Sequence, residues 1–230
     1  MNNINFPAHY YDNRKKLYPD INDRKWNDWK WQYSNRICSK EKLPYNIPFN
    51  NNEKLNKTME SFNFAVTPYF LSLMNLNDPE GPLYKQVFPS FEELLKDERL
   101  KPDPFNEEAK SPLEGIVQRY KNRLIITSGN ICASYCRYCT RKWNWKKSFL
   151  LDEQKINKIL KHIKKDNSIR EVIISGGEPL LLSNDFLDLL LQRIYNIKHV
   201  ELVRIGTRIL SFLPQRIGLE LINILSKYRP

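Results

Sequence analysis

Three of the four cysteines of this chain lie within eight residues, at Cys132, Cys136 and Cys139. Iron-sulfur clusters are usually held by four thiolates, and a closed zinc site also has four ligands, so three thiolates leave one coordination position open. An open iron can bind a substrate or a cofactor. The spacing therefore predicts a metal site, with Cys38 as a bystander far upstream.

Other uses of the three cysteines are less consistent with the sequence. Free cysteines often serve as small buried apolar groups, but three so close together, with Arg137 and Arg141 beside them to favour thiolate, do not fit that use. Three clustered thiols cannot all pair in disulfides. Zinc would need a fourth ligand, and the three histidines lie outside the loop at no finger-like spacing. Zinc stays the minor alternative.

Alternating strands and helices in the second half of the chain would position the cysteine loop. The first apolar, β-branched run directly precedes the loop and is typical of a strand buried on both faces. The alternation predicts an α/β fold with a parallel sheet and right-handed crossovers. The predicted strands are Arg123–Thr127, Glu171–Ser175 and Val200–Ile205, and the predicted helices are 152–165, 183–194 and 219–228.

A polar or glycine-rich segment follows each predicted strand. The cysteine loop follows the first strand, Gly176, Gly177 and Glu178 follow the second, and Arg204 and Arg208 bracket the end of the third. Sheets of this kind place their ligand sites at the carboxyl ends of the strands. We therefore expect the three segments to converge on one site.

Residues 1–110 are expected to form a helical region that packs or oligomerises, ahead of the α/β part at residues 111–230. Trp26 and Trp29 are three residues apart, which predicts one short amphipathic helix that docks on the main body or on another subunit. Stacking of these rings on bases is the alternative, although no basic stripe accompanies them. The run Ser90–Lys96 begins with the pattern of a capping box and predicts a further helix.

Composition narrows the classes of protein that this chain can belong to. No apolar run among the 230 residues approaches the length of a membrane span, so we expect a soluble, cytoplasmic protein without a membrane partner. The formal charge is +11, from 37 basic and 26 acidic side chains, which could indicate a nucleic-acid partner. The basic residues are scattered, however, and this disfavours nucleic acid. A basic iron-sulfur or nucleic-acid-binding protein without catalytic activity stays open as an alternative.

Four segments resemble one branch of the radical S-adenosylmethionine (SAM) superfamily, the lysine 2,3-aminomutase family. Cys132–Arg141 resembles that family's C-S-x-Y-C-R-[HY]-C-T-R, with Ala133 in place of its serine. Ser175–Leu180 resembles S-G-G-D-x-L, with glutamate in place of the aspartate. The other two segments, Arg204–Arg208 and Leu213–Ile217, resemble R-I-G-[ST]-R and L-P-Q-R-I.

The resemblance implies a [4Fe-4S] cluster and SAM as cofactors. The implied cluster ligands are Cys132, Cys136 and Cys139. Gly176, Gly177 and Glu178 would receive the methionine amino group of SAM, because glycines let the backbone approach closely and a carboxylate suits an ammonium group. Arg204 and Arg208 would contact SAM or order the end of the strand.

The resemblance also implies pyridoxal 5′-phosphate (PLP) and an amino acid substrate. The family's R-Y-x-x-R stretch, which binds PLP ahead of the first strand, is matched by Arg119, Tyr120 and Arg123. Two arginines suit an acceptor-rich phosphate. Arg141 matches the arginine that binds the substrate α-carboxylate. Lys142–Trp145 replaces an arginine-rich segment of the family, so the identity of the amino acid stays open.

The implied activity is that of an isomerase which moves an amino group between C2 and C3 of an amino acid such as lysine. The implied fold is the first three βα units of a partial (β/α)6 TIM-like barrel, preceded by the helical N-terminal region. We expect an incomplete barrel and a homo-oligomer. The chain would be either a split or truncated product that needs its other half, which could be encoded separately, or a chain that is inactive by itself. The enzymatic alternative is a radical SAM protein of the same branch that acts in lysine modification of a translation factor.

Overall fold

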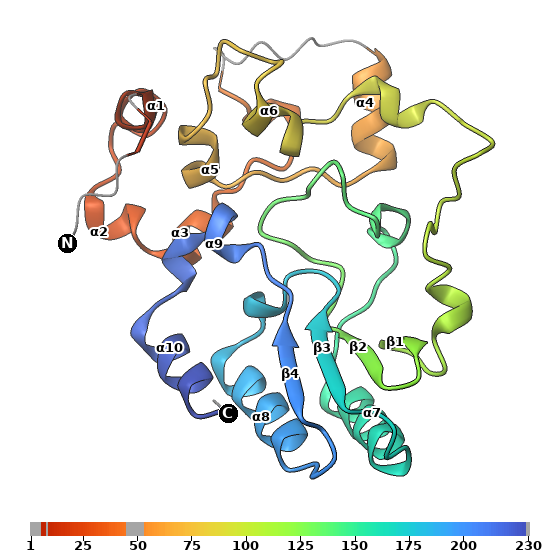
Figure 1. The fold of residues 1–230 in the computed structure, drawn as a ribbon. Helices are drawn as coiled ribbons and strands as arrows, with labels where there is room; N and C mark the ends of the chain where they lie inside the picture. The colour runs from red at the N-terminus through yellow and green to blue at the C-terminus, as the bar shows by residue number, and fades with distance from the viewer. Residues whose placement is uncertain (1–5, 8, 45–52, 229–230) are drawn as a thin grey trace. The chain divides into compact units, whose positions relative to one another are not determined.

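The computed structural model describes residues 6–7, 9–44 and 53–228. The chain forms two compact units, which interleave along the sequence and are described separately (Figure 1). The first unit comprises Met1–Glu98, Ala133–Lys142 and Leu210–Gln215, and the second comprises Arg99–Cys132, Trp143–Ile209 and Arg216–Pro230. Of the cysteine motif, Cys132 therefore belongs to the second unit, and Cys136 and Cys139 belong to the first. The expected division of the chain near residue 110 stays a prediction.

A four-stranded sheet in the order β1-β2-β3-β4 forms the centre of the second unit. The strands are β1 (Ile116–Tyr120), β2 (Arg123–Thr127), β3 (Glu171–Ser175) and β4 (Leu202–Ile205). β2, β3 and β4 are parallel, as predicted, and the predicted bounds of β2 and β3 are confirmed. The antiparallel strand β1, which forms a hairpin with β2, was not predicted.

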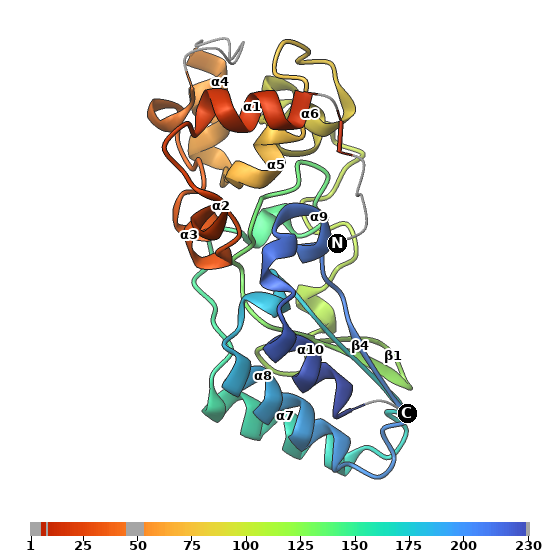
Figure 2. The same cartoon turned by 90° about the vertical axis from the view of Figure 1, so that its left-hand side faces the viewer.

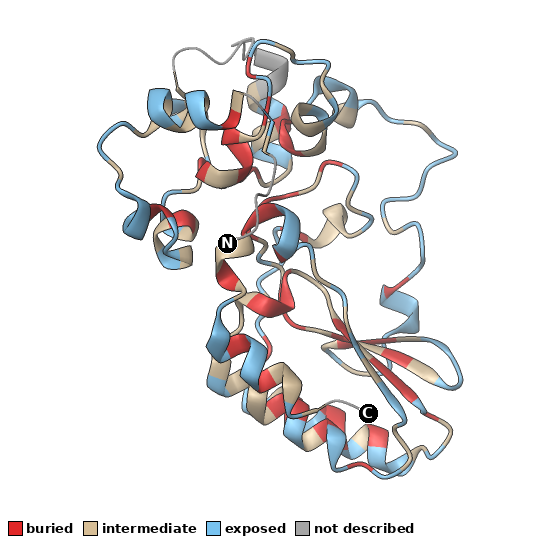
Figure 3. Cartoon of the chain, turned by 60° about the vertical axis from the view of Figure 1, so that its left-hand side comes forward, coloured by how far each residue is buried: buried red, intermediate tan, exposed pale blue. Residues whose placement is uncertain are grey.

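Three helices lie along one face of this sheet: α7 (Glu153–Lys165), α8 (Asn184–Tyr195) and α10 (Leu219–Ser226) (Figure 2). Alternate residues of β2 point to this face, and its Leu124 and Ile126 are buried. Buried positions recur along the helices and strands (Figure 3). On α7 they are the predicted apolar stripe, Ile156, Ile159, Leu160 and Ile163.

Side-chain caps fix where two of these helices begin. Asp152 accepts a hydrogen bond from the Lys155 amide at 2.8 Å, and Ser183 accepts one from the Phe186 amide at 3.3 Å. Such caps satisfy amide groups that have no partner inside the helix. The sequence signal at Ser183 is thus confirmed.

The first unit contains short helices: α1 (His9–Leu17), α2 (Asp23–Trp26), α3 (Trp29–Ser34), α4 (Glu53–Ser61), α5 (Pro68–Ser72) and α6 (Pro82–Val87). The single helix expected through Trp26 and Trp29 is wrong. Asp28 caps α3 by accepting from the Lys30 amide at 2.9 Å, so the two tryptophans lie on different helices. Trp26 is buried and donates to the Tyr10 hydroxyl at 3.1 Å.

The capping box at Ser90 and Glu93 is present, but it begins a 3₁₀ helix over Phe91–Leu94, not an α-helix to Lys96. Among the helices described, none combines the length and the hydropathy that a membrane-spanning segment needs. The helix α9 covers Ile209–Phe212, and the other 3₁₀ segments are Lys40–Lys42, Glu108–Lys110, Lys142–Asn144, Pro179–Leu181 and Pro214–Arg216.

Candidate functional site

The glycine-rich turn after β3 contacts the backbone that leads into the cysteine motif. The Gly177 amide donates to the Gly129 carbonyl at 2.6 Å, and the Glu178 amide donates to the Ile131 carbonyl at 2.8 Å. Both segments follow the carboxyl ends of neighbouring parallel strands, where Thr127 pairs with Ser175. The predicted convergence of these two segments is therefore confirmed.

Only glycine fits at two positions of this turn. A Cβ atom on Gly177 would lie 2.4 Å from the Ile131 carbonyl oxygen and 2.8 Å from the Ile131 nitrogen. Gly176 has φ +97°, a conformation that side chains disfavour. The sequence predicts that these glycines allow a ligand to approach the backbone closely. The structure adds that they allow the protein's own loops to pack.

Glu178 links the ends of β3 and β4 within the second unit. Its carboxylate accepts hydrogen bonds from the Leu180 amide at 3.1 Å, the Thr207 hydroxyl at 2.5 Å and the Arg208 amide at 2.9 Å. Burial raises the pKa of Glu178, and these hydrogen bonds oppose that shift. The carboxylate thus orders the turn and the end of β4, while its predicted contact with an ammonium group stays a prediction.

Arg204 lies on β4 but its side chain turns toward the amino end of the sheet. Its Nε is 2.7 Å from Oε1 of Glu171, the first residue of β3. Arg123 donates from Nε to the other oxygen of the same buried carboxylate at 2.6 Å. Glu171 therefore connects two arginines that the sequence analysis had assigned to different cofactors.

The three residues predicted to bind PLP lie together at the β1–β2 hairpin. The guanidinium carbons of Arg119 and Arg123 are 6.0 and 5.7 Å from the centre of the Tyr120 ring, and Arg119 also lies 5.2 Å from that of Phe105. This stretch leads into β2, the first of the predicted strands, and joins it to the strand β1, which was not predicted. Two guanidinium groups beside exposed aromatic rings fit an aromatic phosphate ester. The hairpin turn adjoins the amino end of β2.

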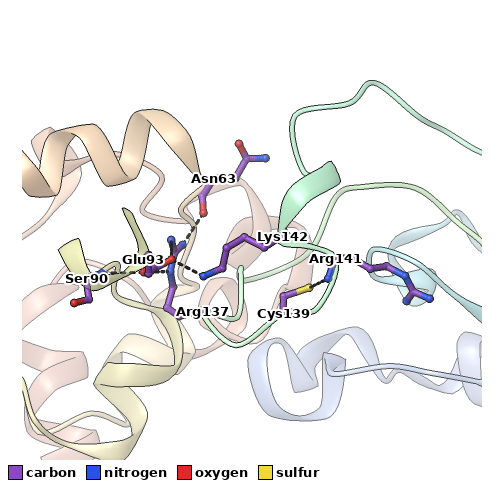
Figure 4. Close-up of polar contacts among 7 residues, drawn as sticks. All are labelled: Asn63, Ser90, Glu93, Arg137, Cys139, Arg141 and Lys142. Carbon is purple, nitrogen blue, oxygen red and sulfur yellow. Dashed lines mark hydrogen bonds and ion pairs between the residues drawn. The ribbon is translucent and has the colours of Figure 1, made fainter. Parts of the chain in front are cut away.

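In the first unit, Cys136 and Cys139 lie in a tight turn. The Cys139 amide donates to the Cys136 carbonyl at 3.0 Å. The Arg141 amide donates to Cys139 Sγ at 3.4 Å (Figure 4). Neither thiol forms a disulfide, nor does that of Cys132 in the second unit, and all three are partly exposed. The donor set fits an iron-sulfur cluster in kind, although no group of three metal-binding side chains is assembled among the residues described.

Arg137 was expected to favour the neighbouring thiolates, and its side chain contacts Glu93. Its side chain is buried and forms a bidentate pair with Glu93, which neutralises its charge locally (Figure 4). Sequence reasoning identified Glu93 only as part of a capping box. The same carboxylate also binds Lys142, which the local pattern could not indicate because 49 residues separate the two.

The sequence of the chain is similar to a protein family and to several curated proteins. Residues 126–229 match the sequence profile of the Radical SAM superfamily. Over 94% of its length the chain is 39% identical to L-lysine 2,3-aminomutase of Clostridium subterminale, covering 53% of that protein. Over the same share it is 42% identical to L-lysine 2,3-aminomutase of Methanococcus maripaludis, covering 51%, and 38% identical to glutamate 2,3-aminomutase of Clostridioides difficile, covering 52%.

The chain spans about half the length of the curated relatives that it matches. The cysteine motif and the glycine-rich turn both lie within the matched region. Together, these comparisons and the motifs identify a radical SAM domain at residues 126–229, in a chain that is similar to lysine 2,3-aminomutases over 94% of its length.

Proposed function

We propose that this chain forms the cluster-binding part of a radical SAM aminomutase that moves an amino group between C2 and C3 of an amino acid such as lysine. The observation that carries the proposal is the packing of Gly177 and Glu178 on residues 129–131, directly before Cys132. This contact joins the glycine-rich turn to the start of the cysteine motif. The names of the relatives support the reaction type.

The proposed cofactors are a [4Fe-4S] cluster, SAM and PLP, which together supply radical hydrogen abstraction and a carrier for the migrating amino group. The cluster would be held by Cys132, Cys136 and Cys139. The turn at Gly176 and Gly177 would present backbone groups to SAM, and Glu178 keeps that turn in place through Thr207 and Arg208.

The chain's arginines have distinct proposed roles toward the other ligands. Arg119 and Arg123, beside the Tyr120 ring, would hold the PLP phosphate, since guanidinium groups bind phosphate oxygens in pairs. Arg141 would bind the substrate carboxylate. Arg204 shares Glu171 with Arg123, so in this proposal it supports the phosphate site as well as the end of β4.

The proposed architecture takes β2, β3 and β4 as the first three strands of a partial (β/α)6 barrel, with the helical N-terminal region ahead of them. The covered share of the relatives supports a C-terminal half that supplies the remaining strands, on a separate chain or in a longer protein. The protein is also proposed to form a homo-oligomer and to be located in the cytoplasm.

Anaerobic reconstitution of the chain with iron and sulfide, followed by dithionite and SAM, tests the cluster chemistry. We expect a four-iron EPR signal that changes when SAM is added, and formation of 5′-deoxyadenosine. Cys136→Ala should abolish both, whereas Cys38→Ala, which removes an exposed thiol outside the motif, should preserve both. A cluster signal that ignores SAM would contradict the proposal.

PLP binding is tested separately by the absorbance of the cofactor on the purified chain. Arg119→Ala should weaken PLP binding by roughly 10-fold, because a charged hydrogen bond to phosphate contributes about 1.5–3 kcal/mol. Arg193→Ala, which removes a guanidinium on α8 that binds Asn157, is the matched control. Equal PLP affinity in the Arg119 variant and the wild type would contradict this part of the proposal and favour a radical SAM protein without PLP.

A further inference from the structure

We propose that Glu93 is a positioning residue for the Cys136–Cys139 turn, acting through Arg137 and Lys142, and that cluster assembly depends on it. The proposal rests on the proposed role of these cysteines as cluster ligands. The three charged residues, which we call the Glu93 anchor, all belong to the first unit. Arg137 and Lys142 lie on either side of Cys139 in the sequence.

Arg137 is fixed by contacts in three directions (Figure 4). Its Nε and Nη2 donate to the two oxygens of Glu93 at 3.0 and 2.7 Å, and its Nη1 donates to the Asn63 carbonyl at 2.8 Å. Its backbone amide donates to the Gln86 carbonyl at 2.7 Å. The residue directly after Cys136 is therefore tied to three separate segments of the N-terminal region.

Lys142 fixes the other side of the turn. Its Nζ donates to Glu93 Oε2 at 2.6 Å and lies 5.0 Å from the centre of the Phe62 ring. Glu93 itself is held by the Ser90 amide, which donates to its Oε1 at 2.9 Å. One carboxylate thus receives donors from its own helix start and from both sides of the cysteine turn.

Burial distinguishes the Glu93 anchor from an ordinary surface ion pair. The side chains of Arg137, Glu93 and Lys142 are 6%, 11% and 19% exposed. Exposed pairs contribute little because water and salt screen them. Removal of one partner from a buried pair is costly, because it leaves an uncompensated charge out of water. Loss of the Glu93 charge would leave two cations facing each other, and the least costly response is for residues 137–142 to move away.

Such movement would release the cysteine turn itself. The turn depends on weak local contacts, the 3.0 Å bond from the Cys139 amide to Cys136 and the 3.4 Å bond from the Arg141 amide to sulfur. Removal of a residue that orients a metal ligand commonly lowers the affinity for the metal by roughly 10–100-fold. The Glu93 anchor is in this position, because Arg137 directly follows Cys136 and Lys142 lies three residues after Cys139.

The test compares Glu93→Gln with Glu92→Gln in the full chain. Glu92 is the exposed neighbour on the same 3₁₀ helix, so its variant makes the same change of charge and shape at a site outside the anchor. The first readout is the rate at which each cysteine is alkylated in the metal-free chain, resolved by mass spectrometry. The second is the rate at which the reconstituted chain loses iron to a chelator.

In Glu93→Gln we expect Cys136 and Cys139 to be alkylated about tenfold faster relative to Cys38. Loss of a hydrogen bond to a charged group changes the equilibrium between the closed and the open turn by about that factor or more. Iron loss should be roughly 10-fold faster or more. Glu92→Gln should match the wild type in both. Equal rates in the two variants, or the same acceleration at all four cysteines, would overturn the proposal.

Arg137→Lys provides a second test if Glu93→Gln does not fold. Lysine keeps the charge but cannot bond to both Glu93 oxygens and to Asn63 together. We expect unchanged far-ultraviolet circular dichroism with faster alkylation of Cys136 and Cys139, and unchanged alkylation in this variant would overturn the proposal. A wild-type chain that holds no iron would contradict the proposed function, whereas the alkylation comparison tests the anchor without any cluster.

Discussion

Gly177→Ala is the sharpest test of how the glycine-rich turn holds the start of the cysteine motif. The added methyl group would lie 2.4 Å from the Ile131 carbonyl oxygen and 2.9 Å from the Gly129 carbonyl oxygen. These neighbours are backbone atoms, so no side chain can rotate to relieve the contact. The two loops must therefore separate.

The expected loss of stability follows from that separation. Overpacking alone costs about 1–3 kcal/mol. Weakening of the two hydrogen bonds from Gly177 and Glu178 adds about 0.5–1.5 kcal/mol each. The total is about 2–6 kcal/mol, which lowers the urea midpoint by roughly 1–3 M for a slope near 2 kcal/mol/M. Iron retention should fall as well, because the displaced backbone leads directly to Cys132.

Gly218→Ala is the matched control for this measurement. A Cβ atom at Gly218 would meet nothing within 4 Å, so the same substitution adds a methyl group without a clash. Gly218 is the N-cap of α10, where alanine is a weaker cap than glycine, and we expect a change within about 1 kcal/mol. If Gly177→Ala unfolds at the same urea concentration as Gly218→Ala, the packing argument is wrong.

Two further predictions concern the helix α7 and the Glu93 anchor. Asp152→Ala removes the cap of α7 and should cost about 1 kcal/mol in urea unfolding, while Asp152→Asn, which preserves a capping oxygen, should cost far less; equal losses would contradict this. Burial tends to raise the pKa of Glu93, but Arg137 and Lys142 outweigh burial and lower it. Because this pKa is lowered in the folded protein, the ionised carboxylate contributes fully to stability above pH 4.5, the ordinary pKa of a glutamate. That contribution is lost as the pH falls through the lowered pKa. The stability difference between wild type and Glu93→Gln should therefore shrink below pH 4.5, and a constant difference would refute the assignment.

The parallel strands could be predicted because their signal is local. The centres of β2 and β3 are apolar and rich in β-branched residues, and the structure has both strands at the predicted residues. β1 was missed because only Ile116 and Val117 are apolar, and the rest of the strand forms through pairing with β2. The tryptophan segment was misjudged for a different reason. Its spacing fits one helix, but the cap at Asp28 starts a second one.

The residues of the candidate site were identified from motifs, whereas their partners were not. Gly177 and Glu178 stand out in the sequence because of their position after a strand. Their contacts with Ile131 and Thr207 depend on the register of the parallel strands, which sequence alone does not specify. Glu171 illustrates the same limit, because it looks like an ordinary strand residue until Arg123 and Arg204 are seen on its two oxygens.

The two sides of the cysteine motif are held by different kinds of interaction. Close backbone packing on Gly177 fixes the chain before Cys132, and buried charges fix the chain around Cys136 and Cys139. Steric packing does not depend on ionisation or salt, whereas a buried ion pair depends on the carboxylate being ionised. Acid should therefore release the Cys136–Cys139 side of the motif first, with the Cys132 side still ordered. The 3₁₀ helix over Phe91–Leu94 would thus act on two of the three proposed ligands through Arg137 and Lys142, because it carries the carboxylate on which that side of the motif depends.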